Sequence, residues 1–433
     1  MNIKSNKISI LAAALALALS NSAVAQTQVI HAGQLLAVPG EKPLNKQTIV
    51  IEDGKILSVE KGFLPASNFA NDATLIDLSK SFVMPGLMDM HVHLQTEFGA
   101  HNTQDTVQLS DADIAMQSVH FAKITLMSGF TTVRDLLSNP EQMYALRDGI
   151  NKGWIEGPRI IAGAGVSITG GHLDVDGMSP DMLDIKSSET ICDGPYECRK
   201  ITRLAIKYGA DAIKVSSTGG VLSDTDTGTG QQMTDDELKE IVDTAHGLGR
   251  KVASHAHAAA GINAALRAGV DSVEHGSYAN KESLKLFKKT GAYLVPTLLA
   301  GDTVVHMAEN DDFMSGSIRE KALRVGGDML KNFRKSYKAG VKIAFGTDSG
   351  VSRHGINAQE AVLMHKAGMS TSDILKSATV NGADLINMSD KLGTIEEGKL
   401  ADIIATDNSP LKNIEELLDV DFVMKGGKVF KQQ

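Results

Sequence analysis

The distribution of apolar and polar positions divides the chain into a β-rich beginning, a long alternating middle and a β-rich end. From 28 to 76, short β-branched runs are separated by turn residues, and the Asp-Gly pair at 53–54 is a hairpin signal. The stretch 422–430 repeats this character around two glycines. We therefore expect the two ends of the chain, 26–81 and 389–433, to pair into one small β-sandwich lobe.

Between these ends, strand-like segments alternate with helical ones, which is typical of βα units around a parallel sheet. A capping box formed by Thr234 and Glu237 indicates the start of one helix. Eight such units predict an α/β fold, a (β/α)8 TIM barrel over 82–388. The predicted strands are 82–90, 131–136, 159–164, 211–217, 251–257, 272–276, 292–297 and 342–348.

Two connections in this middle region are unusually long. Residues 165–194 follow the third predicted strand and residues 218–233 follow the fourth, and both are rich in Gly, Asp and Ser. Loops of that length inside a compact domain are usually functional or disordered. Because barrels place their chemistry at the carboxyl ends of the strands, we expect these loops to border the functional site.

The first 25 residues differ from the rest. Lys4 and Lys7 precede an apolar run over 8–19, and small residues lead to Ala25, a pattern typical of a cleavable secretory signal. The run is shorter than the roughly 20 residues that a membrane span needs. We expect cleavage after residue 25 and a mature protein without a membrane segment, in the periplasm or secreted. In that oxidising setting Cys192 and Cys198 form a disulfide or remain free thiols, and the sequence leaves both open.

The composition narrows the class of partner. The chain has 433 residues, 42% of them hydrophobic, and only two cysteines, so a disordered chain, a collagen and a disulfide scaffold are excluded. Lys plus Arg is 43 against 52 for Asp plus Glu, and no basic cluster is longer than Lys-Lys. This acidic charge balance argues against nucleic acid as a binding partner. We expect a small-molecule substrate, and a homo-oligomeric protein.

Histidines gather at the predicted carboxyl ends of strands. His91 and His93 close the first strand, His255 the fifth and His275 the sixth, and Asp348 supplies a carboxylate after the eighth. Side chains two apart in a strand point to the same face, as two ligands of one ion must. Imidazole and carboxylate suit Zn²⁺ and similar divalent ions. We therefore predict a metal site here rather than a set of structural histidines.

Lys214 makes this prediction more specific. It lies in the apolar fourth strand, whose carboxyl end should face the same end of the barrel as the histidines. A free ammonium beside cations would be strongly repelled. A neutral lysine, in contrast, could add CO₂ and form a carbamate whose two oxygens bridge two metal ions. The alternative is a lysine that pairs with a nearby acid and has no metal contact.

Taken together with Pro-Gly-Leu-Met-Asp-Met-His-Val-His at 85–93, the ligand set resembles the amidohydrolase superfamily with two metals and a carboxylated lysine. The stretches 378–383 and 392–402 are similar to the closing signature of that family, so the likeness covers essentially the whole mature chain. It is greatest for the metal-dependent Xaa-Pro dipeptidases and the carboxypeptidase-like, ochratoxinase-like amidases. The resemblance implies two Zn²⁺ or similar ions and these ligands: His91, His93 and Asp348 for the more buried ion, His255 and His275 for the other, and carboxylated Lys214 between them.

The resemblance also implies an activity, hydrolysis of an amide or peptide bond next to a C-terminal carboxylate. Asp348 would carry a proton from the attacking water to the leaving amine, and His257 would help to hold the developing oxyanion. Three further residues are candidates for substrate contacts: His172 in the third loop, and Arg353 and His354 after Asp348, where a guanidinium would match a carboxylate.

Two other functions stay open, a phosphotriesterase or lactonase with the same metal centre, and a non-enzymatic barrel that has lost its metals. A deaminase is disfavoured because no glutamate follows His255 over 256–260. The sequence also has no HExxH helix and no Gly-x-Ser-x-Gly elbow, which disfavours helix-based zinc peptidases and serine hydrolases.

Overall fold

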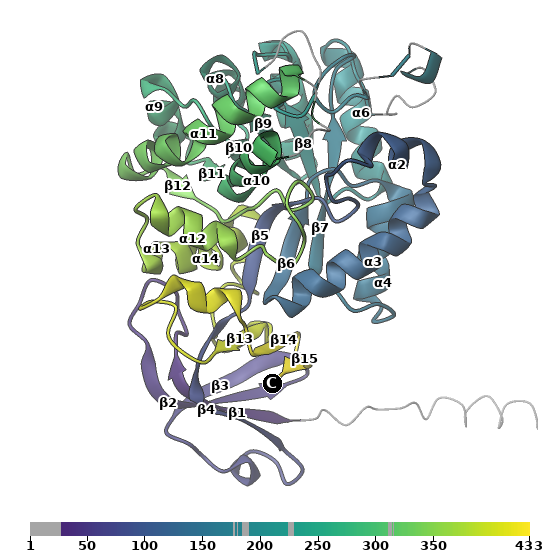
Figure 1. Ribbon diagram of the computed structural model, residues 1–433. Helices are drawn as coiled ribbons and strands as arrows, with labels where there is room; N and C mark the ends of the chain where they lie inside the picture. Colours follow the sequence, from purple (N-terminus) through teal and green to yellow (C-terminus); the bar gives the residue numbers. More distant parts are fainter. Residues whose placement is uncertain are drawn as a thin grey trace, which may run out of the picture.

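The protein consists of a barrel and a smaller β lobe, which lies at the lower end of the view in Figure 1. The structure is a computed structural model that describes residues 27–175, 178–179, 181–183, 190–223, 229–310, 314 and 316–433. The predicted secretory signal, 1–25, lies outside the described residues.

The lobe is a seven-stranded mixed sheet to which both ends of the chain contribute. Strand β4 joins them, since it pairs with β1 on one side and antiparallel with β13 on the other. The sheet curls over one apolar core, in which Ile49 of β2 lies with Phe422 of β14. The prediction that the termini form one lobe is therefore confirmed. The strand order is β15 (Lys428–Gln432), β14 (Phe422–Lys425), β13 (Ile403–Thr406), β4 (Thr74–Pro85), β1 (Gln28–Leu35), β2 (Leu44–Glu52) and β3 (Lys55–Lys61).

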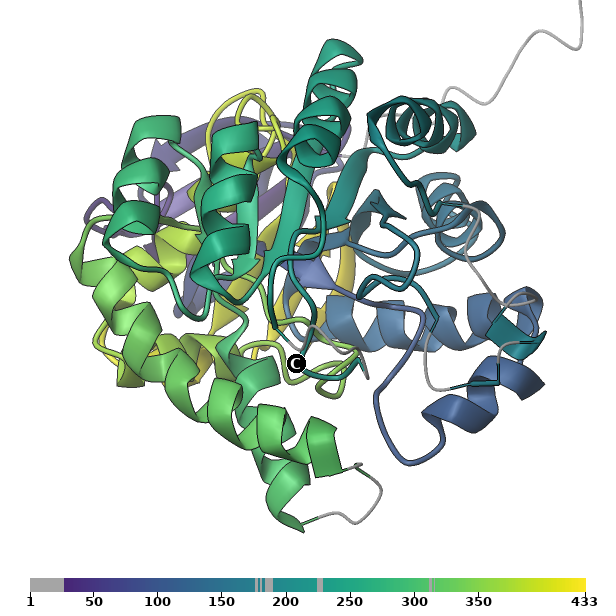
Figure 2. The ribbon, with the colours of Figure 1, turned by 90° about the horizontal axis from the view of Figure 1, so that it is seen from above.

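The barrel is an eight-stranded parallel sheet whose helices pack around it (Figure 2). Backbone hydrogen bonds close it, because Met90 N donates to Phe345 O and Asp348 N donates to His91 O. This confirms the predicted (β/α)8 architecture. In chain order the strands are β5 (Leu87–Val92), β6 (Phe130–Asp135), β7 (Arg159–Val166), β8 (Ala212–Ser216), β9 (Lys251–Ala256), β10 (Ser272–His275), β11 (Tyr293–Val295) and β12 (Lys342–Ile343).

The helices follow the strands with caps that the sequence encodes. Thr234 caps α7 through a hydrogen bond from Glu237 N, and the Glu237 carboxylate accepts from Thr234 N, as predicted. The helices are α2 (Asn102–Gln108), α3 (Asp111–Met127), α4 (Ala145–Asn151), α6 (Pro195–Tyr208), α7 (Asp235–Gly247), α8 (Ala259–Ala268), α9 (Lys281–Thr290), α10 (Leu298–Asn310), α11 (Gly316–Lys338), α12 (Gln359–Lys366), α13 (Thr371–Ser377) and α14 (Val380–Leu385). Short 3-10 or π turns are Ala66–Asn68, Pro140–Tyr144 and Ile414–Leu418.

The first barrel strand departs from its predicted bounds, 82–90. Residues 82–85 belong to β4 in the lobe, and the barrel strand β5 begins only at Leu87. Gly86 marks the break, since a Cβ there would lie 2.2 Å from Thr131 Oγ1 of the neighbouring strand. The apolar pattern hides this break because both halves are buried.

Cys192 and Cys198 are joined by a disulfide, which decides between the two states that the sequence left open. The bond lies where the long third loop returns to the barrel, since Cys192 N donates to Ser167 O. None of the helices in the described part of the chain combines the length and the apolar character that a bilayer crossing needs.

Candidate metal centre

A pocket of about 400 Å³ opens at the carboxyl ends of the barrel strands. Its lining combines titratable side chains with apolar groups and also includes Gln95 and Thr96. All six predicted metal ligands line this pocket, together with His172 and His257. The lining therefore brings together side chains that are far apart in the chain, such as His91 and Asp348, which are 257 residues apart.

Three of the predicted ligands converge closely. His91 Nε2 lies 3.3 Å from His93 Nε2 and 3.5 Å from Asp348 Oδ1, and His93 Nε2 lies 3.1 Å from the same oxygen. Asp348 Oδ1 is buried and receives no aligned hydrogen bond from any residue that the structure describes. Buried carboxylate oxygens are normally satisfied, so this orphaned oxygen beside two imidazole nitrogens fits a shared cation.

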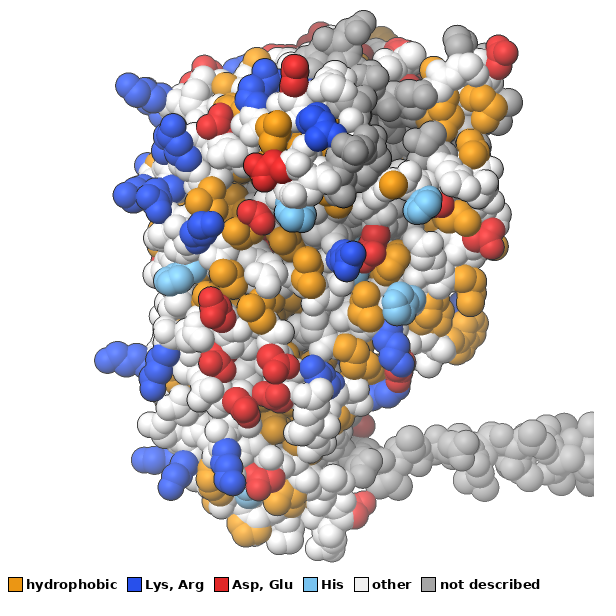
Figure 3. Space-filling view, viewed as in Figure 1, with side chains coloured by type: hydrophobic (Ala, Val, Ile, Leu, Met, Phe, Trp, Pro, Cys, Tyr) orange, Lys and Arg blue, Asp and Glu red, His pale blue; other side chains and the backbone are white. Residues whose placement is uncertain are grey.

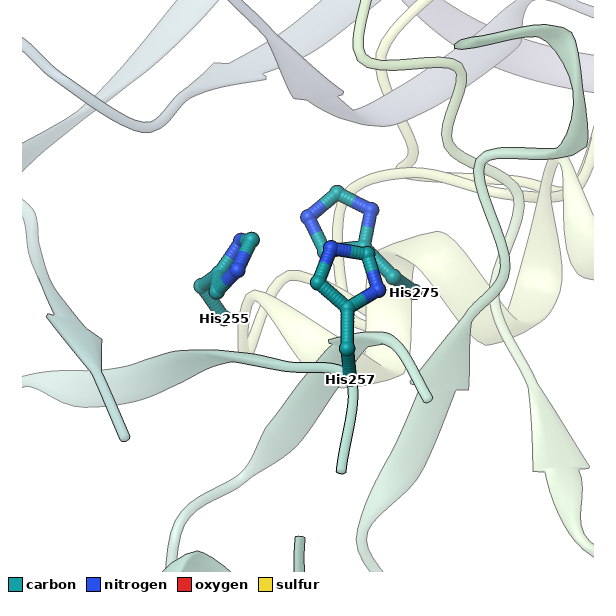
Figure 4. Close-up of side chains that lie close together, drawn as sticks. All are labelled: His255, His257 and His275. Carbon is teal, nitrogen blue, oxygen red and sulfur yellow. The ribbon is translucent and has the colours of Figure 1, made fainter. Parts of the chain in front are cut away.

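The second group consists of His255, His257 and His275, whose rings face one another in Figure 4. One nitrogen of each lies within 4.8 Å of the others, and His275 also lies within that limit of His91 and Asp348. Hydroxyl groups orient two of the rings, because His257 Nδ1 is 2.8 Å from Ser277 Oγ and His275 Nδ1 is 2.6 Å from Thr297 Oγ1. The other ring nitrogen of His275 remains available for an ion, and that of His257 for an ion or for a hydrogen bond to a substrate.

Lys214 lies between the two groups, with Nζ 3.4 Å from His91 Nε2. Burial lowers the pKa of Lys214 to about 8, although the negative charges of Glu274 and Asp348 act to raise it. Burial also lowers the pKa of His91, His255 and His275 well below the usual range. Neutral imidazoles, a carboxylate and a lysine that readily loses its proton are the forms that bind divalent ions, so the residues present fit the predicted centre.

Glu274 and Arg134 support the centre from inside the barrel, and the sequence reasoning missed both. Glu274 Oε2 lies 3.0 Å from His91 Nδ1, and its other oxygen accepts from Arg134 at 3.0 Å and from Ser272 at 2.5 Å. Arg134 in turn donates to Met90 O. The signal was present as charged residues in two otherwise uncharged strand segments, Arg134 with Asp135 in β6 and Glu274 in β10, but only barrel closure reveals the contact.

The two long loops meet over the centre, as predicted from their length. His172 of the long third loop lies against His255, with the two rings tilted to one another and their centroids 4.2 Å apart. Its Nδ1 lies 3.0 Å from Ser223 Oγ in the other long loop, and its backbone N donates to Gln232. His172 therefore reaches the pocket, where it was expected.

Arg353 and His354 are not among the residues that line the pocket, so the structure gives no support to the prediction that they contact substrate. Arg353 is exposed, and neither residue lines the pocket. His354 is buried elsewhere, because its ring stacks on Phe121 and its Nε2 lies 2.9 Å from Thr96 O. Sequence spacing alone does not reveal which side chains after Asp348 line the pocket.

Comparison with known proteins agrees with this geometry. Residues 82–430 match the amidohydrolase family. The chain belongs to this family. The amidohydrolase is also 31% identical to the ochratoxinase of Aspergillus niger, over 96% of this chain and 89% of that protein. It therefore lies in the ochratoxinase-like group of the family.

Solved structures place the amidohydrolase among enzymes that cleave amide bonds. A Xaa-Pro dipeptidase with bound methionine in its active site is 39% identical, with a TM-score of 0.88 over 94% of this chain and all of that one. A prolidase complexed with N-methylphosphonate-L-proline is 29% identical, with a TM-score of 0.84 and the same coverage. The A. niger ochratoxinase structure is 30% identical, with a TM-score of 0.82, and covers 94% and 96% of the two chains. The protein is thus a metal-dependent hydrolase that acts on amide bonds of small molecules.

Proposed function

We propose that this amidohydrolase is an exported enzyme with two Zn²⁺ or similar ions that cleaves an amide bond next to a C-terminal carboxylate. Its substrate would be a dipeptide or an N-acyl amino acid. The observation that carries the proposal is the position of Lys214 Nζ, 3.4 Å from His91 Nε2 and in the same pocket as the other candidate ligands. A buried lysine among imidazoles has no evident structural purpose there.

In this proposal, the amine of Lys214 adds CO₂ and releases a proton, which gives an anionic carbamate between the two ligand groups. The lowered pKa of Lys214 favours the neutral amine that this reaction needs. Bound divalent ions would supply the Lewis acidity that polarises the scissile carbonyl and acidifies water. The more buried ion would be held by His91, His93 and Asp348, and the other by His255 and His275.

The side chains of the protein would manage protons and orientation. Asp348 lines the pocket beside the candidate ligands, where its carboxylate would take a proton from the attacking water and return it to the leaving amine. His257 is held by Ser277, and burial lowers its pKa to about 4, so at neutral pH it is a neutral donor for the carbonyl oxygen. His172, with a pKa lowered by burial to about 3, would contact the substrate from the loop side.

The substrate assignment rests on the pocket and on the relatives. The relatives named above are a Xaa-Pro dipeptidase, a prolidase and an ochratoxinase. Among the described lining residues there is no arginine, and Lys214 is the lysine. The substrate carboxylate would therefore be met by neutral donors, for which His172, Gln95 and Thr96 are available in the lining.

Export, a soluble mature form and a homo-oligomer remain part of the proposal. The Cys192–Cys198 disulfide supports an oxidising compartment. On the face seen in Figure 3, basic and acidic side chains are interspersed, and neither sign covers the surface. This supports a small molecule, rather than a nucleic acid, as the partner.

The test compares dipeptides that have a free C-terminus with the same dipeptides carrying a C-terminal amide, using the zinc-loaded enzyme. We expect turnover of the free forms and a large loss for the blocked forms. Equal turnover of both, or preferential hydrolysis of phosphotriesters or lactones, would contradict the proposal.

A second test addresses Lys214. The Lys214→Ala variant should lose activity and recover part of it when a short carboxylic acid is added, since that acid replaces the carbamate. Metal content, measured on the same samples, should fall with the activity. Unimpaired turnover in the variant would refute the bridging role.

A further inference from the structure

Two adjacent helices form an apolar wall of the pocket, opposite in character to the metal centre. Five lining residues build it: Ala300, Gly301 and Val304 of α10, and Gly326 and Met329 of α11. None of their side chains is charged or able to donate a hydrogen bond. We refer to these five residues as the α10–α11 wall.

Small residues determine the shape of this wall. A Cβ on Gly326 would lie 2.6 Å from Gly301 O, and a Cβ on Gly301 would lie 2.6 Å from Met329 Sδ. The two helices therefore approach each other as closely as glycine allows, and Met329 covers Gly301. The wall is consequently smooth and apolar, with Met329 as its one long and flexible side chain.

The wall is held firmly beside the centre. The buried carboxylate of Glu360 accepts hydrogen bonds from Leu298 N at 3.0 Å and Leu299 N at 2.6 Å, which fixes the first turn of α10. The preceding residue, Thr297, contacts His275 Nδ1 at 2.6 Å. Ala300 thus lies three residues along the chain from the group that orients a candidate ligand, and the wall and the candidate ligands line the same pocket.

We infer that the α10–α11 wall receives an apolar side chain of the substrate and selects a bulky uncharged one, aromatic or long aliphatic, over a small or charged one. This inference rests on the proposed function and specifies its substrate class. A bulky apolar group would bury surface at about 25 cal/mol per Å². A charged group would lose hydration without gaining a partner, and a small group would leave the wall uncovered.

The experiment changes the volume of the wall in two directions. Ala300→Leu should shrink the pocket, and Met329→Ala should enlarge it. kcat/KM is measured on two series, Xaa-Pro and N-acetyl-Xaa-type substrates, with Xaa being Ala, Leu, Phe or Trp. In at least one series we expect Ala300→Leu to lower the Phe-to-Ala ratio of kcat/KM by roughly 10- to 200-fold. Met329→Ala should raise the Trp-to-Leu ratio.

Matched controls place the same changes outside the pocket. Asp302→Leu adds a leucine on the exposed side of α10, and Met307→Ala removes a methionine that packs against the core without lining the pocket. Both controls should leave the ratios unchanged. If the ratios of both wall variants match the wild type in both series, the inference is overturned. If Ala300→Leu does not fold, Met329→Ala alone decides.

Failure of the proposed function would be recognised separately, because the wild type would then cleave no substrate of either series. In that case calorimetry with the zinc-loaded protein still tests the wall. N-acetylphenylalanine should bind more tightly than N-acetylalanine, and Ala300→Leu should remove the difference. Equal binding of the two ligands to the wild type would overturn the inference.

Discussion

At the residue scale, the contact between Glu274 and His91 links the barrel interior to the candidate centre. The carboxylate of Glu274 is fully buried, and its charge is balanced by Arg134. It fixes the ring of His91 so that Nε2 faces the other candidate ligands. A carboxylate behind a metal-binding imidazole also increases the basicity of the ligand nitrogen.

Replacing this carboxylate should therefore weaken metal binding. We expect Glu274→Gln to lower zinc affinity by roughly 10- to 100-fold, measured by competition with a chromophoric chelator. Asp402→Asn is the control, because it breaks a buried ion pair, with Arg159 at 2.6 Å, away from the centre. It should reduce stability and leave zinc affinity unchanged. Equal zinc affinity in Glu274→Gln and the wild type would exclude the proposed orienting role.

At the scale of elements, the start of α10 should make stability depend on pH. Burial raises the pKa of Glu360 from 4.5 to about 8, although the Leu298 and Leu299 amides oppose this, and the charge of Asp89 adds to it. The folded state thus binds the proton more tightly than the unfolded state. The resulting stabilisation is complete below pH 4.5 and is lost as pH rises through about 8.

The Glu360→Gln variant isolates this effect, because it has no proton to lose. Between pH 4.5 and 8, the Tm of the wild type should fall steadily relative to the Tm of the variant. Parallel Tm curves for the two proteins would show that Glu360 stays ionised. Comparing the two proteins at the same pH and zinc concentration cancels the pH dependence of metal binding, which both share.

The disulfide stabilises the end of the third loop, since it links Cys192 to the first turns of α6. Replacing both cysteines with alanine should lower the free energy of unfolding by about 2 kcal/mol, measured by urea denaturation. Dithiothreitol should destabilise the wild type similarly and leave the double variant unaffected. Equal free energies of unfolding for the wild type and the double variant would contradict this prediction.

At the scale of the whole molecule, the candidate centre joins distant parts of the barrel. Its side chains come from β5, β8, β9, β10 and the segment after β12, so one bound cluster connects five places around the ring. A ligand that binds only the folded state stabilises it by mass action, by about 2.7 kcal/mol when its concentration is 100 times the dissociation constant.

Metal removal should therefore destabilise the barrel as a unit. We expect a chelator to lower the Tm and added zinc to restore it, with the Tm rising as the free zinc concentration rises. A His91→Ala, Asp348→Ala double variant should respond less to zinc than the wild type, because it lacks two candidate ligands of the more buried ion. If chelation leaves the Tm of the wild type unchanged, the centre does not connect the barrel in this way.

Much of this fold could be predicted from local patterns. Alternation along a strand shows that His91 and His93 share a face, and the Thr234 capping box identifies the start of a helix, because both effects act within a few residues. Contacts between distant residues could not be predicted in the same way. Arg134 meets Glu274 across the barrel, and Gly86 divides one apolar run into strands of two different sheets.

The amino-acid sequence alone thus determined the (β/α)8 barrel, the lobe from the two termini and the candidate ligands at the strand ends, since these follow from periodicity and residue type. Only the tertiary structure decided which side chains enter the pocket. His172 and the α10–α11 wall line the pocket with the candidate ligands, whereas Arg353 and His354 are not lining residues. The reason is physical, because the direction of a loop side chain depends on barrel closure and on packing against residues far away in the chain.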